Sequence, residues 1–437
     1  MPTTSRTCTR TTRCPTRSWR SSGELRSGSG ELLSGIEIRP LGPDDDLEAE
    51  IDLARRSFGP VSAASRLHRL ASVMRSIKAA EMLGAFDGAR LIGSARYHPM
   101  RQWWRGRSMA MAGVAGVKVA PEARGRGVGR ALMMSLFPEM RRRGYPVSTL
   151  FPATVPLYRS LGWEFAGGNY ETTVPASALA TLIGPDDAAS DDSGGAGAAA
   201  ELRRTGPADS AAVVETLGSV YLALGDCGPA THDADLVASW LEDAESFGYL
   251  AEDGFLNYRW VDGHDAVQVD LLVAASARTA RAFWRILSSH ASMADTVRAC
   301  VAPDDPVSWL TREEAAATCR VQGWMLRCLD APAAVAARGF PATAAVSVRL
   351  ELRDQAVPAN TGTWDLEISG GNGQLAPAVS SRTPSLRLGS RGFAALYGGV
   401  PLSTLRRAGL VSGSSAGCDD ALDAAFGGRP AFMLHGF

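Results

Sequence analysis

The hydrophobic positions of the chain change their period several times, and each change marks the boundary of a predicted element. In IEIRPLGPDDD, which starts at Ile36, apolar and polar residues alternate as in a strand, and the Asp run at 44–46 opens a helix that reaches Phe58. MLGAFDGARLIGSARYHP, which starts at Met82, predicts a β-hairpin with its turn at Asp87-Gly88. This part of the chain therefore begins with a strand, a helix and two antiparallel strands.

A glycine-rich turn follows the next predicted strand, which covers 108–119, and leads into a helical period. From Gly127 the apolar residues recur at the spacing of one helix face. The positions on that face are Val128, Leu132, Leu136 and Met140. VSTLF predicts a strand at 147–151, VPLYRSLG a short helix at 155–162, and WEFAGGNYETTV, from Trp163, a closing hairpin.

A second copy of this order is predicted after a linker. Residues 184–200 are dominated by Gly, Ala, Ser and Asp and have no apolar period, so we expect a domain over 35–183 and another over 201–322. LRRTGPADSAAVVETL resembles the first strand and helix, and GYLAEDGFLNYRWVDG resembles the first hairpin. LLVAASARTARAFWRIL has a strand and a helix with no glycine between them, which predicts a degenerate repeat without a ligand.

The two ends of the chain differ from these repeats. Residues 323–437 alternate strands with short helices, which predicts a third unit of α+β type. Residues 1–34 are rich in Ser, Thr and Arg and poor in aliphatic side chains, so we expect a disordered tail or an over-extended start of the chain.

Composition excludes several classes of function. With 45 Lys and Arg against 46 Asp and Glu the chain lacks the basic surplus that nucleic acid requires, and no apolar run approaches the ~18 residues of a membrane helix. We expect neither a nucleic-acid partner nor membrane insertion. The cysteines never form a C-x-x-C pair, which favours a reduced cytoplasmic location without a metal site or disulfide framework. They are Cys8, Cys14, Cys227, Cys300, Cys319, Cys328 and Cys418.

The glycine-rich turn carries the sharpest chemical signal. VKVAPEARGRGVGRALMMSL at 117–136 places Gly125, Gly127 and Gly129 between a strand and a helix, where free N–H groups and the helix dipole favour phosphate. A P-loop is excluded because no lysine follows these glycines, and the spacing does not match the G-x-G-x-x-G of a dinucleotide fingerprint. The turn therefore predicts a phosphate-binding loop of another kind.

The run Arg124-Gly125-Arg126-Gly127-Val128-Gly129 resembles the R/Q-x-x-G-x-G/A loop of the GCN5-related N-acetyltransferases (GNAT). Two such units followed by a unit that resembles a sterol carrier protein are similar to the Eis (enhanced intracellular survival) branch, and the resemblance covers about 35–437. It implies an α/β (α+β) protein with two tandem GNAT folds, each a mixed, mainly antiparallel sheet flanked by helices, and a sterol-carrier-protein-like C-terminal domain.

The resemblance also implies a co-substrate, acetyl-CoA, and no metal. Backbone amides of the loop would hold the diphosphate, and the edge of the preceding strand would pair with the pantetheine arm. The implied acetyl-CoA contacts are Val117, Lys118, Val119, Arg124, Gly125, Arg126, Gly127, Val128, Gly129, Arg130, Ala153 and Thr154.

Two catalytic residues are implied by the same resemblance. Leu-Tyr-x-x-x-Gly-Trp in ATVPLYRSLGW looks like the family's helix with its acid tyrosine, which makes Tyr158 the group that protonates the coenzyme A sulfur. A phenol with a pKa of ~10 stays protonated at neutral pH, as a general acid requires. In the family the base is the carboxylate of the last residue, here Phe437, and RPAFMLHGF is unusually apolar for a free end. A backbone N–H near Val117 is the expected oxyanion donor.

Several other residues that could act in catalysis or in substrate binding are open to two interpretations. His435 is either a second base or a packing residue, and His98, near two tryptophans, either lines the substrate entrance or belongs to the core. The Asp run at 44–46 is either an acidic mouth for amines or a helix cap, and we favour the cap. Gly436 stands where relatives often carry an acidic residue, which argues against a strong preference for aminoglycosides.

The sequence thus predicts an acetyl-CoA-dependent N-acetyltransferase that acts on primary amines of a small molecule, such as an aminoglycoside or polyamine, in a ternary complex. One alternative is an acyltransferase dedicated to one natural product or to protein lysines. Another is a lipid or sterol carrier with a vestigial loop, against which the intact loop and Tyr158 argue. The resemblance implies a homohexamer.

Overall fold

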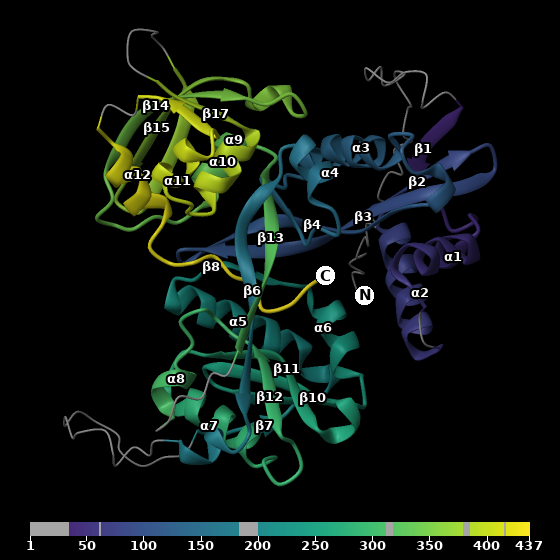
Figure 1. Ribbon diagram of the computed structural model, residues 1–437, viewed down its shortest axis with the longest axis vertical. Helices are drawn as coiled ribbons and strands as arrows, with labels where there is room; N and C mark the ends of the chain where they lie inside the picture. The colour runs from purple at the N-terminus through teal and green to yellow at the C-terminus, as the bar shows by residue number, and fades with distance from the viewer. Residues whose placement is uncertain (1–34, 61–62, 183–199, 312–317, 379–384, 415–416) are drawn as a thin grey trace, which may run out of the picture.

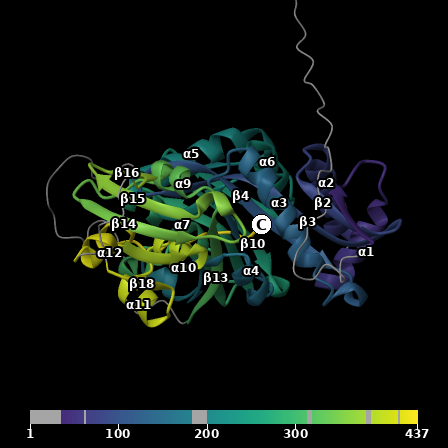
Figure 2. The same cartoon turned by 90° about the horizontal axis from the view of Figure 1, so that it is seen from above.

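The computed structural model describes residues 35–60, 63–182, 200–311, 318–378, 385–414 and 417–437. The predicted N-terminal tail and nearly all of the predicted linker lie outside these ranges. Three units surround the C-terminal residue, which lies near the middle of the molecule in two perpendicular views (Figures 1 and 2). Seen from above, the third unit lies at one end and the first two helices at the other (Figure 2).

The first unit follows the predicted order of strands and helices up to its last strand, with one helix more than expected. Asp46 caps the first helix by accepting hydrogen bonds from the amides of Glu48 and Ala49, which confirms that the Asp run opens a helix. The elements are β1 (Ile36–Pro40), α1 (Leu47–Phe58), the unpredicted α2 (Ala63–Lys78), β2 (Met82–Asp87), β3 (Arg90–Trp104), β4 (Arg107–Val119), α3 (Val128–Arg142), β5 (Val147–Leu150), α4 (Val155–Ser160) and β6 (Glu164–Pro175).

The prediction of a closing hairpin from Trp163 is wrong, because β6 is one continuous strand. Its two adjacent glycines suggested a turn, but they serve close packing instead. A Cβ atom on Gly167 would collide with the carbonyl oxygen of Ala431 and with the ring of Trp324, and one on Gly168 would lie 2.8 Å from Val321. The strand passes from the first unit into the second, where it pairs with β12.

The second unit repeats the first in part and shares its sheet. β11 and β12 are parallel, as are β4 and β5 in the first unit, and β8 pairs with β3 of the first unit. The elements are β7 (Arg203–Arg204), α5 (Ser210–Leu224), β8 (Cys227–Thr231), α6 (Ala234–Leu241), β9 (Ser246–Ala251), β10 (Gly254–Val261), β11 (Ala266–Ala274), α7 (Ala277–Ser288), β12 (Thr296–Cys300) and α8 (Val307–Leu310).

The third unit contains a separate five-stranded sheet in the order β16-β15-β14-β17-β18. The chain reaches it through β13, which lies between β5 and β6 in the large sheet, so the boundary expected between 322 and 323 falls inside a strand. The elements are β13 (Thr318–Cys328), α9 (Ala331–Ala337), β14 (Val346–Arg353), β15 (Gly362–Ser369), β16 (Asn372–Pro377), β17 (Ser385–Gly389), α10 (Ser390–Tyr397), α11 (Leu402–Arg407), β18 (Val411–Gly413) and α12 (Asp419–Phe426).

One sheet of 13 strands therefore runs through the first and second units, in the order β1-β2-β3-β4-β5-β13-β6-β12-β11-β10-β9-β7 with β8 beside β3. Buried residues of the first and third units, among them Trp104, Trp324 and Tyr397, form one hydrophobic cluster. The units are thus joined by a shared strand and a shared core.

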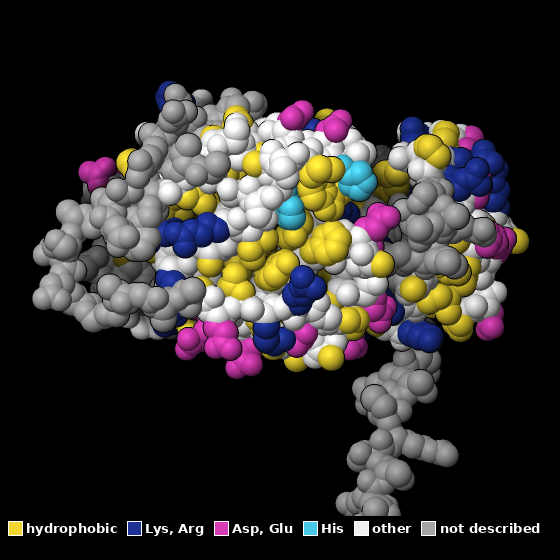
Figure 3. Space-filling model, turned by 90° about the horizontal axis from the view of Figure 1, so that it is seen from below, with side chains coloured by type: hydrophobic (Ala, Val, Ile, Leu, Met, Phe, Trp, Pro, Cys, Tyr) yellow, Lys and Arg dark blue, Asp and Glu magenta, His cyan; other side chains and the backbone are white. Residues whose placement is uncertain are grey.

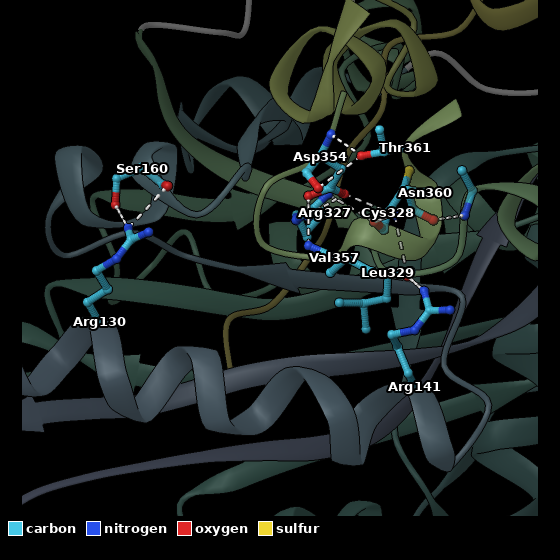
Figure 4. Close-up of polar contacts among 11 residues, drawn as sticks. Arg130, Arg141, Ser160, Arg327, Cys328, Leu329, Asp354, Val357, Asn360 and Thr361 are labelled. Carbon is cyan, nitrogen blue, oxygen red and sulfur yellow. Dashed lines mark hydrogen bonds and ion pairs between the residues drawn. The ribbon is translucent and has the colours of Figure 1, made fainter. Parts of the chain in front are cut away.

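A buried polar network also joins the first and third units (Figure 4). Arg327, near the end of β13, donates from Nη2 to both carboxylate oxygens of Asp354 at 2.6 Å. Asn360 donates to the same carboxylate at 3.0 Å and to the carbonyl oxygen of Cys328 at 3.2 Å. Arg141 of α3 donates to the carbonyl oxygen of Leu329. Both charged partners of the ion pair are buried, so the pair depends on these additional hydrogen bonds.

None of the helices in the described part of the chain combines the length and the apolar run that crossing a bilayer requires.

Candidate acetyl-transfer site

The site begins where two parallel strands diverge. β4 pairs with β5 at Met111–Val147, Ala112–Ser148 and Gly113–Thr149, and this ladder goes no further. β4 continues to Val119, whereas β5 ends at Leu150. The backbone of β4 beyond Gly113 therefore offers an open edge on the β5 side, where an extended ligand can pair with it.

A bulge lies in this free part of β4. The register with β3 changes from Arg96–Ala115 to Ser94–Lys118, so β4 contains one extra residue around Gly116 and Val117. Gly116 has a φ of +58°, which a glycine adopts at little cost. The bulge turns the backbone near Val117 away from regular pairing, as the expected oxyanion donor requires.

The side chain of Lys118 is not available to a coenzyme. Its Nζ lies 2.5 Å from Oε1 of Glu50 on α1, and both side chains are buried. Val117 and Val119 are half-buried and pack against the first unit's core. The predicted acetyl-CoA contact of Lys118 can therefore come only from its backbone. The backbone edge of the strand at 117–119 can supply all three predicted contacts.

The glycine-rich loop forms the predicted N-terminus of α3. Gly125 and Gly127 have φ values of +77° and +82°, and Gly127 is the N-cap of the helix. The amide of Ala131 donates to the carbonyl oxygen of Gly127, so the amides of residues 128–130 precede the first helical hydrogen bond. These N–H groups, together with the helix dipole, suit an anionic diphosphate. The buried side chain of Val128 leaves only its backbone for such a contact.

The three arginines of the loop have partners within the chain. Arg124 donates to the carbonyl oxygen of Val119 at 3.4 Å, and Arg126 donates to Asp87 at 3.1 Å. Arg130 reaches across to α4, where it donates to Oγ of Ser160 at 2.9 Å and to the carbonyl oxygen of the same residue at 3.2 Å (Figure 4). These side chains surround the loop at the surface.

Three further residues with a predicted role, Ala153, Thr154 and Tyr158, lie in or just before helix α4. A Cβ atom on Gly129 would lie 3.5 Å from Cδ2 of Leu157, so α3 and α4 touch near their N-terminal ends. Ala153 and Thr154 are exposed at the start of α4. Tyr158 is buried, its ring packs edge-on against Trp163 at 6.2 Å, and burial raises its pKa to about 12. The phenol is therefore protonated at neutral pH.

The last residue of the chain lies at the divergence of β4 and β5. A Cβ atom on Gly113 would lie 2.8 Å from Cε2 of Phe437, and the rings of Phe151 and Phe437 stand edge-on at 5.8 Å. Gly113 closes the ladder with β5, and Phe151 follows β5 directly. The chain thus ends at the same place from which the open edge of β4 begins.

Hydrogen bonds from both the first and the second unit hold this tail. The amide of Gly168 donates to the carbonyl oxygen of Ala431 at 3.1 Å, and the amide of Met433 donates to the carbonyl oxygen of Gly168 at 3.0 Å. The amide of Phe432 donates to the carbonyl oxygen of Cys227 in β8 at 2.9 Å. The expectation of a buried, anchored end is confirmed for Ala431 to Leu434.

Sequence reasoning missed one residue beside the chain's end, His232, which directly follows β8. Its ring lies 6.4 Å from that of Phe437 and 5.0 Å from that of His435. No local pattern around His232 could have indicated this, because the contact joins the second unit to the last residues of the chain.

Among the described residues no cluster of three or more His, Cys, Asp or Glu is arranged to hold a metal ion. The groups that are present, an open strand edge, a bulge, free helical amides and a protonated phenol, fit an extended ligand that carries phosphates and a thioester.

Comparison with known protein families matches all three units. Residues 37–166 and residues 233–328 each match a family described as acetyltransferase (GNAT) domain. Residues 331–434 match a family described as sterol carrier protein domain. The match over 233–328 covers the second unit, which was predicted to repeat the first.

Relatives are similar over most of their length. N-acetyltransferase Eis of Mycobacterium tuberculosis is 28% identical over 357 residues, which cover 78% of this chain and 85% of that protein. The crystal structure of a GCN5-related N-acetyltransferase from Kribbella flavida is 42% identical with a TM-score of 0.85, covering 92% of this chain and 98% of that one. Eis1 from Mycobacterium abscessus has the same fold, with a TM-score of 0.72 at 23% identity over 92% of this chain and 100% of that one. This chain therefore belongs to the GCN5-related N-acetyltransferase family, is an N-acetyltransferase, and is similar to the Eis proteins over most of its length.

Proposed function

We propose that the protein transfers the acetyl group of acetyl-CoA to a primary amine of a small molecule by direct attack in a ternary complex. The main support for this proposal is the position of the last residue. Phe437 lies where β4 and β5 diverge, and in an acyl transfer the acceptor amine must lose a proton at the place where the thioester meets it. The terminal carboxylate is the base that this arrangement supplies.

The other roles are distributed along the open edge of β4 and the helices beside it. When bound, acetyl-CoA supplies the thioester carbonyl and a thiolate leaving group. The free amides at the start of α3 hold the diphosphate, and the bulge near Val117 donates an N–H to the thioester oxygen. Tyr158, protonated because burial raises its pKa, supplies the proton that the departing thiolate takes up.

Extension of the chain tests the proposed base. Two glycines added after Phe437 move the carboxylate away from the strands, and we expect thiol release with amines to fall by a hundredfold or more, the contribution of a general base. The dissociation constant for acetyl-CoA, measured by calorimetry, should stay unchanged, because the loop is intact. Two glycines added before residue 35 are the matched control. Undiminished thiol release from the C-terminally extended enzyme contradicts the proposed role of the carboxylate.

The acceptor is identified by thiol release with aminoglycosides, polyamines, simple monoamines and lysine peptides. Release with lysine peptides alone would identify a protein acyltransferase. Binding of lipid in a displacement assay, without thiol release with any amine, would instead favour a lipid carrier.

We also propose that the protein forms a homo-oligomer, with a hexamer as the form that the family resemblance implies. Hydrophobic side chains gather on the face of the second unit that is seen from below (Figure 3). Exposed large side chains of this unit include Phe247, Met293 and Trp309, the last of them 83% exposed. An exposed apolar surface of this kind favours self-association. Light scattering coupled to size-exclusion chromatography measures the mass, and a monomer at micromolar concentration contradicts this proposal.

A further inference from the structure

Three histidines from three separate parts of the chain meet beside its last residue. His98 belongs to β3, His232 follows β8 of the second unit, and His435 lies two residues before the end. The ring centroids of His98 and His232 are 6.5 Å apart, and those of His232 and His435 are 5.0 Å apart. The ring of Phe437 stands 6.4 Å from that of His232, so the cluster adjoins the proposed base.

The ring nitrogens of two of these histidines, His232 and His435, lack partners among the described residues. His232 is only 5% exposed, and both ring nitrogens of His232 and both of His435 are buried without a hydrogen bond to any described residue. Buried polar groups are nearly always hydrogen-bonded, because an unmade bond costs the full desolvation of the group. Unpartnered nitrogens beside a reaction site are accounted for by a ligand that hydrogen-bonds to them when it is present.

The three imidazoles are neutral at physiological pH. Burial, followed by the charges of Arg96 and Arg75, lowers the pKa of His98 to about 3, and burial lowers the pKa of His435 to about 4. Burial, followed by His435 and His98, holds the pKa of His232 well below its usual range. A neutral imidazole offers one nitrogen that accepts a hydrogen bond and one that donates.

An aromatic side chain, Trp240, also borders this cluster. The ring of Trp240 stands 5.0 Å from that of His232 and 5.4 Å from that of His435, both nearly edge-on. The carboxylate of Asp233, the neighbour of His232 in the chain, is occupied as the N-cap of α6, where it accepts from the amide of Leu236 at 2.8 Å. The charged side chains that lower the pKa of His98 are arginines, Arg96 and Arg75.

We propose that His98, His232 and His435 form the wall of the acceptor pocket, and that this wall admits a primary amine whose remaining body is uncharged and apolar. This inference rests on the proposed function. The amine's N–H groups bond to the free imidazole nitrogens, and its single charge faces the terminal carboxylate. A second ammonium on the same molecule would lie among neutral rings and near Arg96 and Arg75, where a buried charge has no partner. The second acetyltransferase-like unit then contributes to specificity through His232, although it lacks a glycine loop.

Three variants of the full-length enzyme test this wall, with 2-phenylethylamine and spermidine as acceptors. His232→Phe keeps a planar ring but loses both nitrogens, and we expect its KM for 2-phenylethylamine to rise about tenfold, the loss of one hydrogen bond. His232→Gln restores a hydrogen-bonding group and should recover most of that loss. His264→Phe is the matched control, because His264 lies at the surface beside Trp260, in a separate cluster of rings.

The dissociation constant for acetyl-CoA should be equal in all these proteins, which separates a positioning role from a general folding defect. The wild-type enzyme should have a kcat/KM at least tenfold higher for 2-phenylethylamine than for spermidine, a comparison that requires no variant. A preference of the wild type for spermidine overturns the inference, as does an unchanged KM in a folded His232→Phe enzyme. If the wild type acetylates amines in either of those cases, the proposed function stands alone. If it releases no thiol with any amine, the proposed function and the inference both fail.

Discussion

At the scale of single residues, burial sets the protonation state of each group around the site. Tyr158 and His435 are shifted in opposite directions by the same cause, because burial disfavours whichever form is charged. The phenol stays protonated and can donate, whereas the imidazole stays neutral and can accept. Lys118 and Glu50 show the other solution to burial, an ion pair between two buried side chains.

Replacement of Tyr158 by phenylalanine removes one oxygen from a buried ring and should preserve the fold. We expect kcat to fall by about a hundredfold or more, because a general acid acts in the transition state, while acetyl-CoA binds with unchanged affinity. Steady-state kinetics and calorimetry measure the two quantities. Tyr145→Phe, another buried tyrosine of the same core, is the control and should keep its kcat. A normal kcat in the Tyr158→Phe enzyme would show that Tyr158 is a packing residue and not the general acid.

The histidine cluster predicts a loss of stability in mild acid. His435 has a pKa of about 4 in the folded chain and ~6.5 when unfolded, so the unfolded state binds more protons between these values. The stabilisation from this residue is complete above pH 6.5 and decreases as the pH falls towards 4, with about 2 kcal/mol lost by pH 5. Urea unfolding at pH 7.5 and pH 5 measures this change. In His435→Gln the difference between the two pH values should be smaller by about that amount, and an equal difference would show that His435 does not titrate as described.

At the scale of elements, β6 connects the site to the rest of the molecule. Its glycines allow the C-terminal tail to approach the strand closely, and the amide and carbonyl of Gly168 both bond to the tail. The terminal carboxylate is therefore positioned through a backbone contact to β6, some distance before the end of the chain. The side chain of Asn169 adds a bond to the carbonyl oxygen of Met433 at 2.9 Å.

A methyl group on Gly167 should displace this tail. In Gly167→Ala the new Cβ collides with the carbonyl oxygen of Ala431 and with Trp324, so we expect kcat/KM for amines to fall at least tenfold. Acetyl-CoA binding, which we propose to use the loop before α3, should be nearly unchanged. Gly206→Ala is the control, since a Cβ there meets nothing within 4 Å. Full activity in Gly167→Ala would mean that the tail does not need this contact.

The sequence predicted the elements whose signal is local. The loop and α3 were found because glycine spacing and apolar period change at the same residue, Gly127. β6 was wrongly predicted as a hairpin. In the sequence, a Gly-Gly pair that forms a turn cannot be distinguished from one that allows a neighbouring ring to pack closely. The pairing of β8 with β3 and the approach of His232 to the chain's end join residues far apart in sequence, for which one chain without relatives gives no periodic signal.

At the scale of the whole molecule, the third unit is attached by polar as well as apolar contacts. The buried pair Arg327–Asp354 lies where β13 leaves the large sheet, and Val357 and Asn360 bond to the same carboxylate. An arginine of the third unit, Arg338, is also buried; it donates to two carbonyl oxygens of its own unit, and its guanidinium lies 4.6 Å from the ring centroid of Trp104 in the first unit. Movement between the units would separate the charges of Arg327 and Asp354.

Removal of one partner of this pair should therefore destabilise the protein. We expect Arg327→Met to lower the free energy of unfolding by about 3–5 kcal/mol, because it leaves the Asp354 carboxylate buried and uncompensated. The double variant Arg327→Met with Asp354→Leu should recover part of that loss. Arg203→Met, which breaks an exposed pair with Asp209, should change stability by less than about 1 kcal/mol. Urea unfolding compares the variants, and a loss in Arg327→Met no larger than in Arg203→Met would show that the buried pair contributes little.

The place of β13 between β5 and β6 has a consequence for the newly made chain. On the ribosome, the strand that fills the gap between β5 and β6 emerges only after the whole second unit has been translated. Until Cys328 has left the exit tunnel, β5 and β6 have facing edges with unfilled hydrogen-bonding groups, a state in which nascent chains aggregate. Shortened transcripts that stop before Thr318 should therefore yield insoluble protein, however complete their acetyltransferase motifs are.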